Sequence, residues 1–245
     1  MKKIFGRKPV LEAINSNIEI DQVIIALNQS GKIIDTIIIA AKKHGIKVRK
    51  LPPAKFKEYD NKDNNQGVVA IISDITYYEP SEIIDAVSGK TNQLFLLLDS
   101  IQDTHNLGAI LRTADACGVD GIFTTIHNSA PITDAVHKTS AGAVNHLKIS
   151  RVKNLGHVIE DLKRNNCWIV GTSLKGEKFY SDADFNIPLG IVLGNEEKGL
   201  RPIIEEHCDF LVKIPMLGKI QSLNVSVSAG IILYEVLRQR NLVKS

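Results

Sequence analysis

Three stretches in the second half of the chain carry polar side chains beside apolar elements that could hold them in place. The residues concerned are Asn106 and Arg112 in the first stretch, Glu196 in the second, and Ser222 and Asn224 in the third. Amide, hydroxyl and carboxylate groups bind polar ligand groups, and arginine offers a planar charged fork for phosphate or a developing negative charge. These residue types favour a site for an electron-rich ligand.

The third stretch lies where a strand gives way to a helix. Pro215 and Gly218 end an apolar strand, and Ser222 or Asn224 can cap the helix by accepting a hydrogen bond from a free backbone N–H. Helical spacing predicts one buried face: Val225, Ala229, Ile232, Leu233 and Val236. With Gln221, the polar cluster exceeds what helix initiation needs, and a helix N-terminus attracts electron-rich ligand groups.

The first stretch also has a helical apolar stripe. Its members are Leu107, Ile110, Leu111 and Ala114. Arg112 falls outside that stripe and is free either to reach a ligand or to form a weak surface pair with Asp115. Asn106 is well placed to cap this helix.

In order and spacing, the three stretches resemble the three motifs of the SpoU family, the 2′-O-ribose RNA methyltransferases of the SPOUT class. Residues 106–114 read Asn-Leu-Gly followed by an arginine, 191–200 resemble a Gly-x-Glu strand-to-loop element, and 222–226 read Ser-Leu-Asn-x-Ser. Three motifs in the correct order are far more specific than one short pattern.

The resemblance implies an α/β fold, with a trefoil-knotted SPOUT parallel sheet and a small N-terminal α/β domain, ribosomal-protein-like, that binds the substrate. It also implies transfer of a methyl group from S-adenosyl-L-methionine to a ribose in RNA, by a homodimer. The residues that match the family's catalytic group are Asn106, Arg112, Glu196, Ser222 and Asn224. Those that match its cofactor pocket are Thr172, Gly194, Ile214 and Leu223.

Each of these residues also has a plainer alternative. Ser222 and Asn224 could merely cap the helix, Glu196 could be a solvated loop charge, and Gly194 could be a turn rather than a place of close cofactor approach. A guanidinium with a pKa above about 12 is a poor proton acceptor. We therefore expect Arg112 to bind phosphate or the developing alkoxide rather than to act as a base.

Before residue 75 the pattern alternates between helix and strand, which predicts a small α/β unit. The expected elements are helices at 10–14, 32–44 and just after Pro53, and strands at 22–27, 47–51 and 67–73. Residues 5–10 resemble the opening of the ribosomal-RNA branch of the family, where Arg7 and Lys8 either contact RNA or are mobile terminal charges. Where that branch often has a histidine before Gln-Gly, this chain reads Asn64-Asn65.

We expect three parts: an RNA substrate-binding domain at 1–75, a linker with a short helix at 76–92, and the methyltransferase domain at 93–245. Apolar runs predict strands in the last part at 94–98, 121–126, 167–171, 189–193 and 210–214. Ligands of open α/β sheets gather at the carboxyl ends of the strands.

Composition fits a globular protein of one large or two modest domains, with 245 residues, 44% hydrophobic and 23% charged. Residues 1–60 hold 12 Lys and Arg against 6 Asp and Glu, whereas the remainder holds 18 against 21, within a net charge of +3. The basic N-terminal part suits a polyanion, or is simply a solvated surface. The three cysteines lie far apart, which predicts a protein without disulfides. No apolar run reaches membrane-spanning length, and we expect a cytoplasmic protein. No histidine spacing suggests a metal site.

Other classes fit less well. No G-x-G-x-x-G occurs, which disfavours a nucleotide-dependent oxidoreductase, and Glu177 replaces the lysine that a phosphate loop requires. We therefore expect a homodimeric 2′-O-ribose methyltransferase, most like the branch that modifies a guanosine of large-subunit ribosomal RNA. The alternatives are a transfer-RNA methyltransferase of the same family and a catalytically silent RNA-binding protein.

Overall fold

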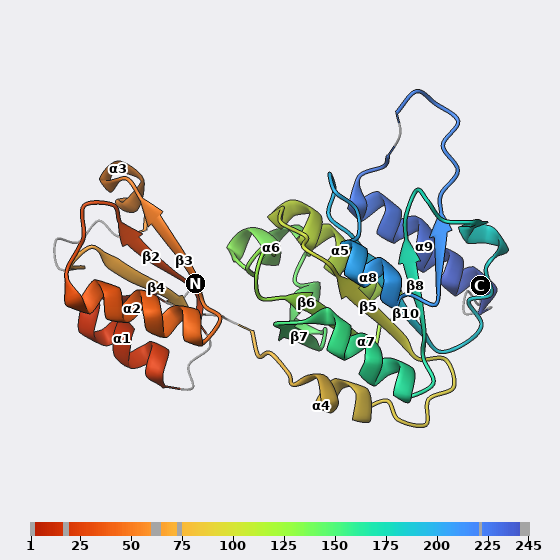
Figure 1. The fold of residues 1–245 in the computed structure, drawn as a ribbon, viewed down its shortest axis with the longest axis horizontal. Coiled ribbons are helices and arrows are strands. Elements are labelled where there is room, and N and C mark those ends of the chain that lie inside the picture. Colours follow the sequence, from red (N-terminus) through yellow and green to blue (C-terminus); the bar gives the residue numbers. More distant parts are fainter. Residues whose placement is uncertain (1–2, 17–19, 60–64, 73–74, 221, 241–245) are drawn as a thin grey trace. The chain divides into compact units, whose positions relative to one another are not determined.

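The chain divides into two compact units (Figure 1). The first comprises Met1–Thr76 with Pro131–Asp134, and the second comprises Tyr77–Ala130 with Ala135–Ser245. The computed structural model describes residues 3–16, 20–59, 65–72, 75–220 and 222–240. Three residues named from the sequence, Asn64, Ser73 and Gln221, lie outside the described residues.

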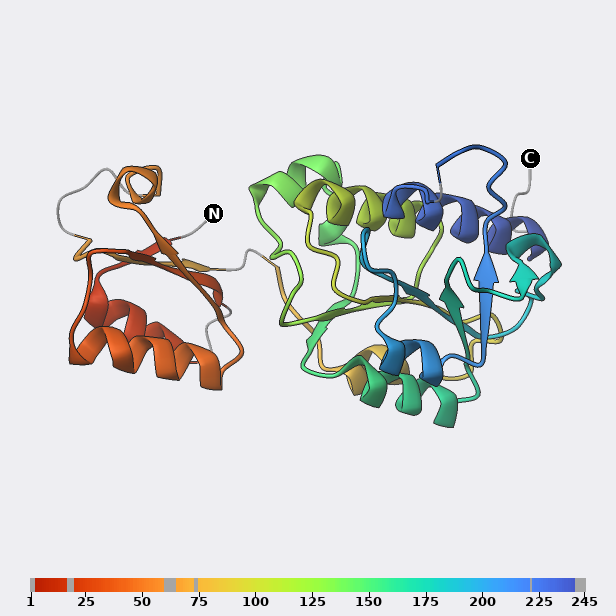
Figure 2. The same ribbon diagram turned by 45° about the horizontal axis from the view of Figure 1, so that its top comes forward.

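The N-terminal unit is built on a four-stranded sheet with the order β1-β4-β2-β3. Its strands are β1 (Lys3–Phe5), β2 (Ile20–Ala26), β3 (Lys47–Leu51) and β4 (Val68–Ile72). Strand β4 runs antiparallel to β1 and β2, whereas β2 and β3 are parallel. Helices α1 (Arg7–Asn15) and α2 (Lys32–Lys43) cover one face, and the short α3 (Pro53–Phe56) lies on the other (Figure 2).

Both long helices of this unit form because their apolar residues recur at helical spacing. In α2, Ile34, Ile37 and Ala41 are buried against the sheet, while Lys42 and Lys43 occupy the last turn, where positive charge complements the helix dipole. The predicted elements of this unit are confirmed to within a few residues. Strand β1 is an addition, since three residues carry no readable periodicity.

The second unit is a seven-stranded sheet in which every strand pairing is parallel, with the order β7-β6-β5-β10-β8-β11-β9. Its strands are β5 (Leu94–Leu98), β6 (Gly121–Thr125), β7 (Ile149–Val152), β8 (Trp168–Thr172), β9 (Lys178–Phe179), β10 (Leu189–Leu193) and β11 (Phe210–Lys213). The predicted α/β class with a parallel sheet is thus confirmed. The trefoil knot stays a prediction.

Helices lie on both faces of this sheet (Figure 2). One face carries α5 (Thr104–Ala116) and α9 (Val225–Gln239), and the other carries α4 (Pro80–Asp85), α7 (Leu155–Arg164) and α8 (Pro202–His207). The remaining helix is α6 (Asp134–Thr139). Every residue of β5, β6 and β10 is buried, which explains their uninterrupted apolar sequences.

The stretch expected to be a linker, residues 76–92, contributes a helix to the second unit. Ile83 and Ile84 of α4 are buried in the core that also holds Phe95 and Leu97 of β5. Lys90 pairs with Asp120 at 2.6 Å. Burial of this kind fixes the segment against the seven-stranded sheet.

Among the described residues, no helix is both long enough and apolar enough to cross a bilayer.

Candidate active site

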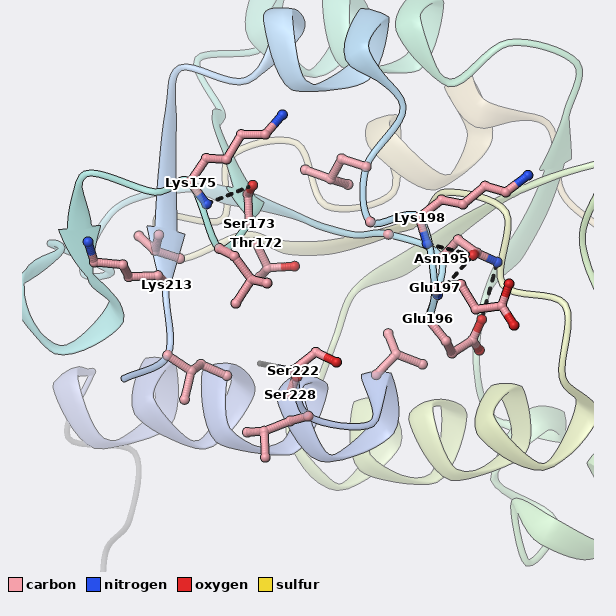
Figure 3. A pocket seen from close by; sticks show the side chains of 18 of the residues that line it. Thr172, Ser173, Lys175, Asn195, Glu196, Glu197, Lys198, Lys213, Ser222 and Ser228 are labelled. Carbon is pink, nitrogen blue, oxygen red and sulfur yellow. Dashed lines mark hydrogen bonds between the residues drawn. The ribbon is translucent and has the colours of Figure 1, made fainter. Parts of the chain in front are cut away.

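A cavity of about 370 Å³ opens at the carboxyl ends of three neighbouring strands, β8, β10 and β11. Thr172, Gly194 and Ile214 stand at or just after these strand ends and all line it. The loop before α9 and the first turns of that helix form the facing wall, where Ser222 and Leu223 also line the cavity (Figure 3). All four residues predicted for the cofactor pocket therefore lie around one cavity, at the sheet edge where ligands of parallel sheets bind.

The N-terminus of α9 is capped by Asn224. Its Oδ1 accepts hydrogen bonds from the backbone N–H of Ser226 at 2.9 Å and from the Ser226 hydroxyl at 2.6 Å. Of the two caps that the sequence allows, Asn224 is therefore the one that forms, and Ser222 is left on the cavity wall. Capping also fixes the direction of the Asn224 amide nitrogen.

That amide nitrogen begins a chain of hydrogen bonds that joins all three sequence motifs. Asn224 Nδ2 donates to Asn106 Oδ1 at 2.9 Å, and Asn106 Nδ2 donates to Glu196 Oε1 at 3.0 Å. Asn195 Nδ2 donates to Glu196 Oε2 at 3.3 Å and to the backbone oxygen of Ser100 at 3.0 Å. Glu196, which lines the cavity, thus has both carboxylate oxygens held by amides.

Asn106 is available for this contact because another residue caps its helix. The predicted capping role of Asn106 is wrong: α5 begins at Thr104, and the carboxylate of Asp103 accepts a hydrogen bond from the Asn106 backbone N–H at 2.8 Å. Asn106 therefore lies in the first turn, where its side chain projects toward the Glu196 loop. The sequence feature that could have identified the N-cap is Asp103, which lies three positions before Asn106 and is a residue type preferred at helix N-caps.

The loop that carries Glu196 is tightly folded on itself. Asn195 and Gly199 exchange backbone hydrogen bonds at 3.0 and 2.9 Å, and Asn195 Oδ1 accepts from the backbone N–H groups of Glu197 and Lys198. A Cβ atom on Gly194 would lie 2.3 Å from the carbonyl carbon of Gly199. The loop's own backbone, rather than space for the cofactor, is therefore what requires glycine at 194.

The end of this loop is anchored by Asp99, a residue that the sequence reasoning missed. Asp99 is fully buried, and its carboxylate accepts hydrogen bonds from Arg201 Nε at 2.7 Å and the Arg201 backbone N–H at 3.0 Å. A carboxylate directly after an uninterrupted apolar strand is the signal that could have revealed it, since this is the ligand edge of the sheet. Asp99 thereby ties the Glu196 loop to β5.

The cavity also has a second polar end, built by residues that the sequence did not reveal. Ser173 Oγ donates to Glu205 Oε1 at 2.8 Å, and Lys175 Nζ lies 3.4 Å from Glu205 Oε2. Figure 3 shows Ser173 and Lys175 at one end of the cavity and Glu196 at the other. These contacts span 30 residues or more of sequence, so no local pattern announces them.

Arg112 is the one predicted catalytic residue that neither lines the cavity nor joins the described hydrogen bonds that lead to Glu196. It is exposed on α5 and forms no hydrogen bond or ion pair with another residue that the structure describes, so the alternative of a surface pair with Asp115 is not observed. Helix geometry explains the separation from Asn106, since six residues at about 100° each turn the side chain well away from the Asn106 direction. Within one chain, Arg112 does not reach the cavity.

Thiol chemistry is not available to this site. Burial raises the pKa of the Cys208 thiol to about 12, and those of Cys117 and Cys167 to about 11. All three therefore remain protonated near neutral pH and are poor nucleophiles. Across the part of the chain that the structure describes, no group of three or more His, Cys, Asp or Glu side chains could hold a metal ion.

The cavity fits S-adenosylmethionine in size and chemistry. Its volume lies in the range of small-molecule sites, and it combines an apolar wall suited to adenine with two polar ends suited to ribose and amino-acid groups. The apolar wall consists of Leu200, Val212, Ile214, Leu223 and Val225.

Comparison with known proteins agrees with this geometry. Residues 93–234 match the SpoU rRNA Methylase family, and residues 3–78 match the family described as RNA 2′-O ribose methyltransferase substrate binding. A Bacillus subtilis (strain 168) protein assigned to the TrmH family of tRNA/rRNA methyltransferases, YacO, is 38% identical over 241 residues, which cover 98% of this chain and 96% of that protein.

Two solved structures extend the comparison. An AdoMet-bound rRNA methyltransferase from Sinorhizobium meliloti is 25% identical with a TM-score of 0.60, covering 99% of this chain and 88% of that one. The A. aeolicus TrmH/SpoU tRNA modifying enzyme is 33% identical with a TM-score of 0.57, and the match covers 66% of this chain and 83% of that enzyme's chain.

The fold, the cavity and these matches define an RNA methyltransferase that uses S-adenosylmethionine. Within that class, the chain belongs to the SpoU rRNA methylase family. Its N-terminal unit is the substrate-binding domain of the family.

Proposed function

We propose that this protein methylates the 2′-oxygen of a ribose in ribosomal RNA, at a guanosine of the large-subunit (23S) RNA. The observation that carries the proposal is the chain of hydrogen bonds from Asn224 through Asn106 to Glu196. It joins all three motifs and ends at Glu196, which lines the cavity. A protein that only bound RNA would have no need of this arrangement.

In this reaction the cofactor supplies an electrophilic methyl group, and a weakly nucleophilic hydroxyl must be oriented and must lose its proton. Asn106 and Asn195 each donate one hydrogen bond to Glu196, which fixes the carboxylate and leaves lone pairs for an N–H or O–H of the bound molecules. We assign these residues to orientation. Arg112 is assigned to the phosphate or the developing alkoxide, where a planar charged fork is effective.

The position of Arg112 supports a homodimer, in which Arg112 of the partner subunit completes each site. The predicted apolar stripe of α9 is buried inside its own subunit and cannot face a partner. Its members are Val225, Ala229, Ile232, Leu233 and Val236. Other apolar residues of α9 remain available, since Val227 and Tyr234 are about half exposed, at 49% and 54%. A dimer built on this outer face would bring a second α5 and α9 close to the cavity.

Two facts favour ribosomal over transfer RNA. The S. meliloti rRNA methyltransferase covers 99% of this chain, whereas the tRNA modifying enzyme covers 66%. The basic charge also concentrates before residue 60, in the unit that matches the substrate-binding family. Ribosomal RNA and the methyl donor are both cytoplasmic, which assigns the reaction to that compartment.

Ribose-methylation mapping of total RNA from a deletion strain tests the proposal directly. We expect one guanosine of the large-subunit RNA to lose its 2′-O-methyl group and to regain it when the purified protein is added with S-adenosylmethionine. Loss of a methyl group from a base would refute the ribose assignment. Loss from a transfer RNA alone would refute the choice of substrate.

A further inference from the structure

The N-terminal unit has a cavity of its own, separate from the cofactor site. It lies where the β1–α1 turn meets the start of α2 and the turn before β4, and its lining includes Phe5, Arg7, Lys8, Ile33 and Gln66. The family match covers this whole unit without assigning a role to any of its residues. The cavity therefore calls for an explanation of its own.

One wall of this cavity is held rigid by a hydrogen-bonded network. Arg7 Nε donates to the backbone oxygen of Gln66 at 3.2 Å, its terminal nitrogen donates to Gln29 Oε1 at 2.5 Å, and its backbone N–H donates to Gln66 Oε1 at 3.1 Å. Arg7 is thus a fixed part of the wall and not a mobile terminal charge. The network joins three segments that are distant in sequence.

Glycine at position 67 makes this packing possible. Gly67 has φ +70°, and a Cβ atom there would lie 2.3 Å from Cγ of Gln29. Asn65 supports the same turn by accepting a hydrogen bond from the Gly67 backbone N–H at 2.8 Å. A turn held this closely presents a preorganised surface, which reduces the entropy that a ligand must lose on binding.

Two groups at the edge of the cavity are left for a ligand. Phe5 is 38% exposed although it is large and apolar, and it ends β1, whose other residues are more covered. Lys8 is exposed and forms no hydrogen bond or ion pair with another residue in the described part of the chain. An exposed ring and an unpaired cation around one hollow are the elements with which proteins bind unpaired nucleotides.

We infer that this cavity binds one unpaired RNA nucleotide, whose base stacks on Phe5 and whose phosphate lies against Lys8, with Arg7 and Gln66 as the fixed wall. The inference rests on the proposed function for the identity of the polymer. It adds that the N-terminal unit recognises a looped or bulged element, because a base inside a duplex cannot stack on a protein ring. Diffuse attraction to the basic surface is the competing explanation.

The test measures binding of the full-length protein to transcribed large-subunit ribosomal RNA by filter retention, over a series of salt concentrations. Phe5→Leu keeps an apolar side chain and removes the ring, so we expect binding to weaken about tenfold, as is usual for one lost stacking contact. Phe5→Tyr keeps the ring and should bind like the wild type. Lys8→Ala should weaken binding and lower the salt slope by roughly 0.7, the value for one phosphate on a single strand.

Lys50→Ala is the matched control, because Lys50 is also exposed in this unit, on β3, and forms no hydrogen bond or ion pair with another described residue. We expect it to weaken binding less than Lys8→Ala does. Wild-type binding by Phe5→Leu, or an equal loss in Lys8→Ala and Lys50→Ala, would overturn the inference in favour of diffuse attraction. Melting curves identify any variant that fails to fold. If Phe5→Leu does not fold, the comparison of Lys8→Ala with Lys50→Ala still decides.

This experiment is independent of the chemistry proposed above. If the wild type fails to methylate ribose, the proposed function is wrong, while the comparison of binding by the variants remains valid. If the wild type methylates ribose and Phe5→Leu has an unchanged KM for RNA, the nucleotide site is wrong and the proposed function stands.

Discussion

Replacing Asn106 by aspartate should disable the active site in a way that acid partly reverses. Asn106 Nδ2 lies 3.0 Å from Glu196 Oε1, so Asn106→Asp places a second carboxylate oxygen against the first. Two unit charges about 4 Å apart repel by about 4 kcal/mol at an effective dielectric constant near 20. If this repulsion displaces Glu196, even 3 kcal/mol of lost transition-state stabilisation lowers the rate by roughly 150-fold.

The pH profile separates repulsion from simple loss of contact. As the pH falls, two adjacent carboxylates take up one proton between them, and a protonated Asp can donate the hydrogen bond that Asn106 donates in the wild type. Activity of Asn106→Asp should therefore recover toward acid pH. Asn106→Ala loses a hydrogen bond to a charged group, about 1.5–3 kcal/mol, and cannot recover in this way.

The assay is single-turnover methyl transfer at saturating cofactor and RNA, with each rate divided by the wild-type rate at the same pH. Asn145→Asp is the control, because Asn145 is exposed and its side chain forms no hydrogen bond with another described residue. Identical pH profiles for Asn106→Asp and Asn106→Ala would refute the reasoning. Wild-type activity in either variant would remove Asn106 from the site.

Three further predictions concern other parts of the catalytic unit. Arg112→Ala should leave the melting temperature and the cofactor affinity nearly unchanged, but it should lower the rate of single-turnover methyl transfer by about two orders of magnitude. Arg112→Lys should restore that rate only in part. Full activity in the alanine variant would contradict this prediction. Arg240→Gln should lower the free energy of unfolding by about 2–4 kcal/mol, because the buried Arg240 guanidinium donates hydrogen bonds to four backbone carbonyls. Urea titration measures this change, and an unchanged urea midpoint would refute the prediction. Burial raises the pKa of the Cys208 thiol to about 12 and those of Cys117 and Cys167 to about 11, so these thiols ionise at lower pH in the unfolded chain than in the folded protein. The free energy of unfolding should therefore be full below about pH 9 and fall as the pH rises toward 11. The measurement is the urea midpoint compared with that of Cys208→Ala, and a midpoint independent of pH across that window would contradict the prediction.

The central strands can be predicted from the sequence because burial on both faces leaves only apolar side chains. The predicted strands 94–98 and 189–193 coincide with β5 and β10. Strands β7 and β9 are not predicted, since Ile149–Val152 is half polar and Lys178–Phe179 is two residues long. Edge strands are short and partly exposed, so their alternation falls below what a local pattern can show.

The site divides in the same manner between local and distant information. Motif matches select Asn106, Glu196 and Asn224, and the structure adds that these side chains are hydrogen-bonded to one another. The roles of Asp99 and Glu205 escape the sequence, because their partners lie 102 and 32 residues away. A carboxylate next to a buried strand can be recognised as unusual in a sequence. Which residue donates hydrogen bonds to that carboxylate depends on the order of the strands in the folded sheet.

The position of Arg112 differs from what its motif alone suggests. A motif assigns it to the same group as Asn106, yet both residues belong to one rigid helix, and the helix turns them in different directions. Six residues at about 100° each leave the two side chains roughly 120° apart around the helix axis. We propose that, if both residues act on one ribose, they come from different copies of α5. Mixing the Arg112→Ala and Asn106→Ala variants tests this. If the two residues act across subunits, each mixed dimer has one intact site out of two. Since half of the dimers are mixed, activity per protein should return to about a quarter of the wild-type value. Continued inactivity of a mixture shown to exchange subunits would mean that Arg112 serves its own chain.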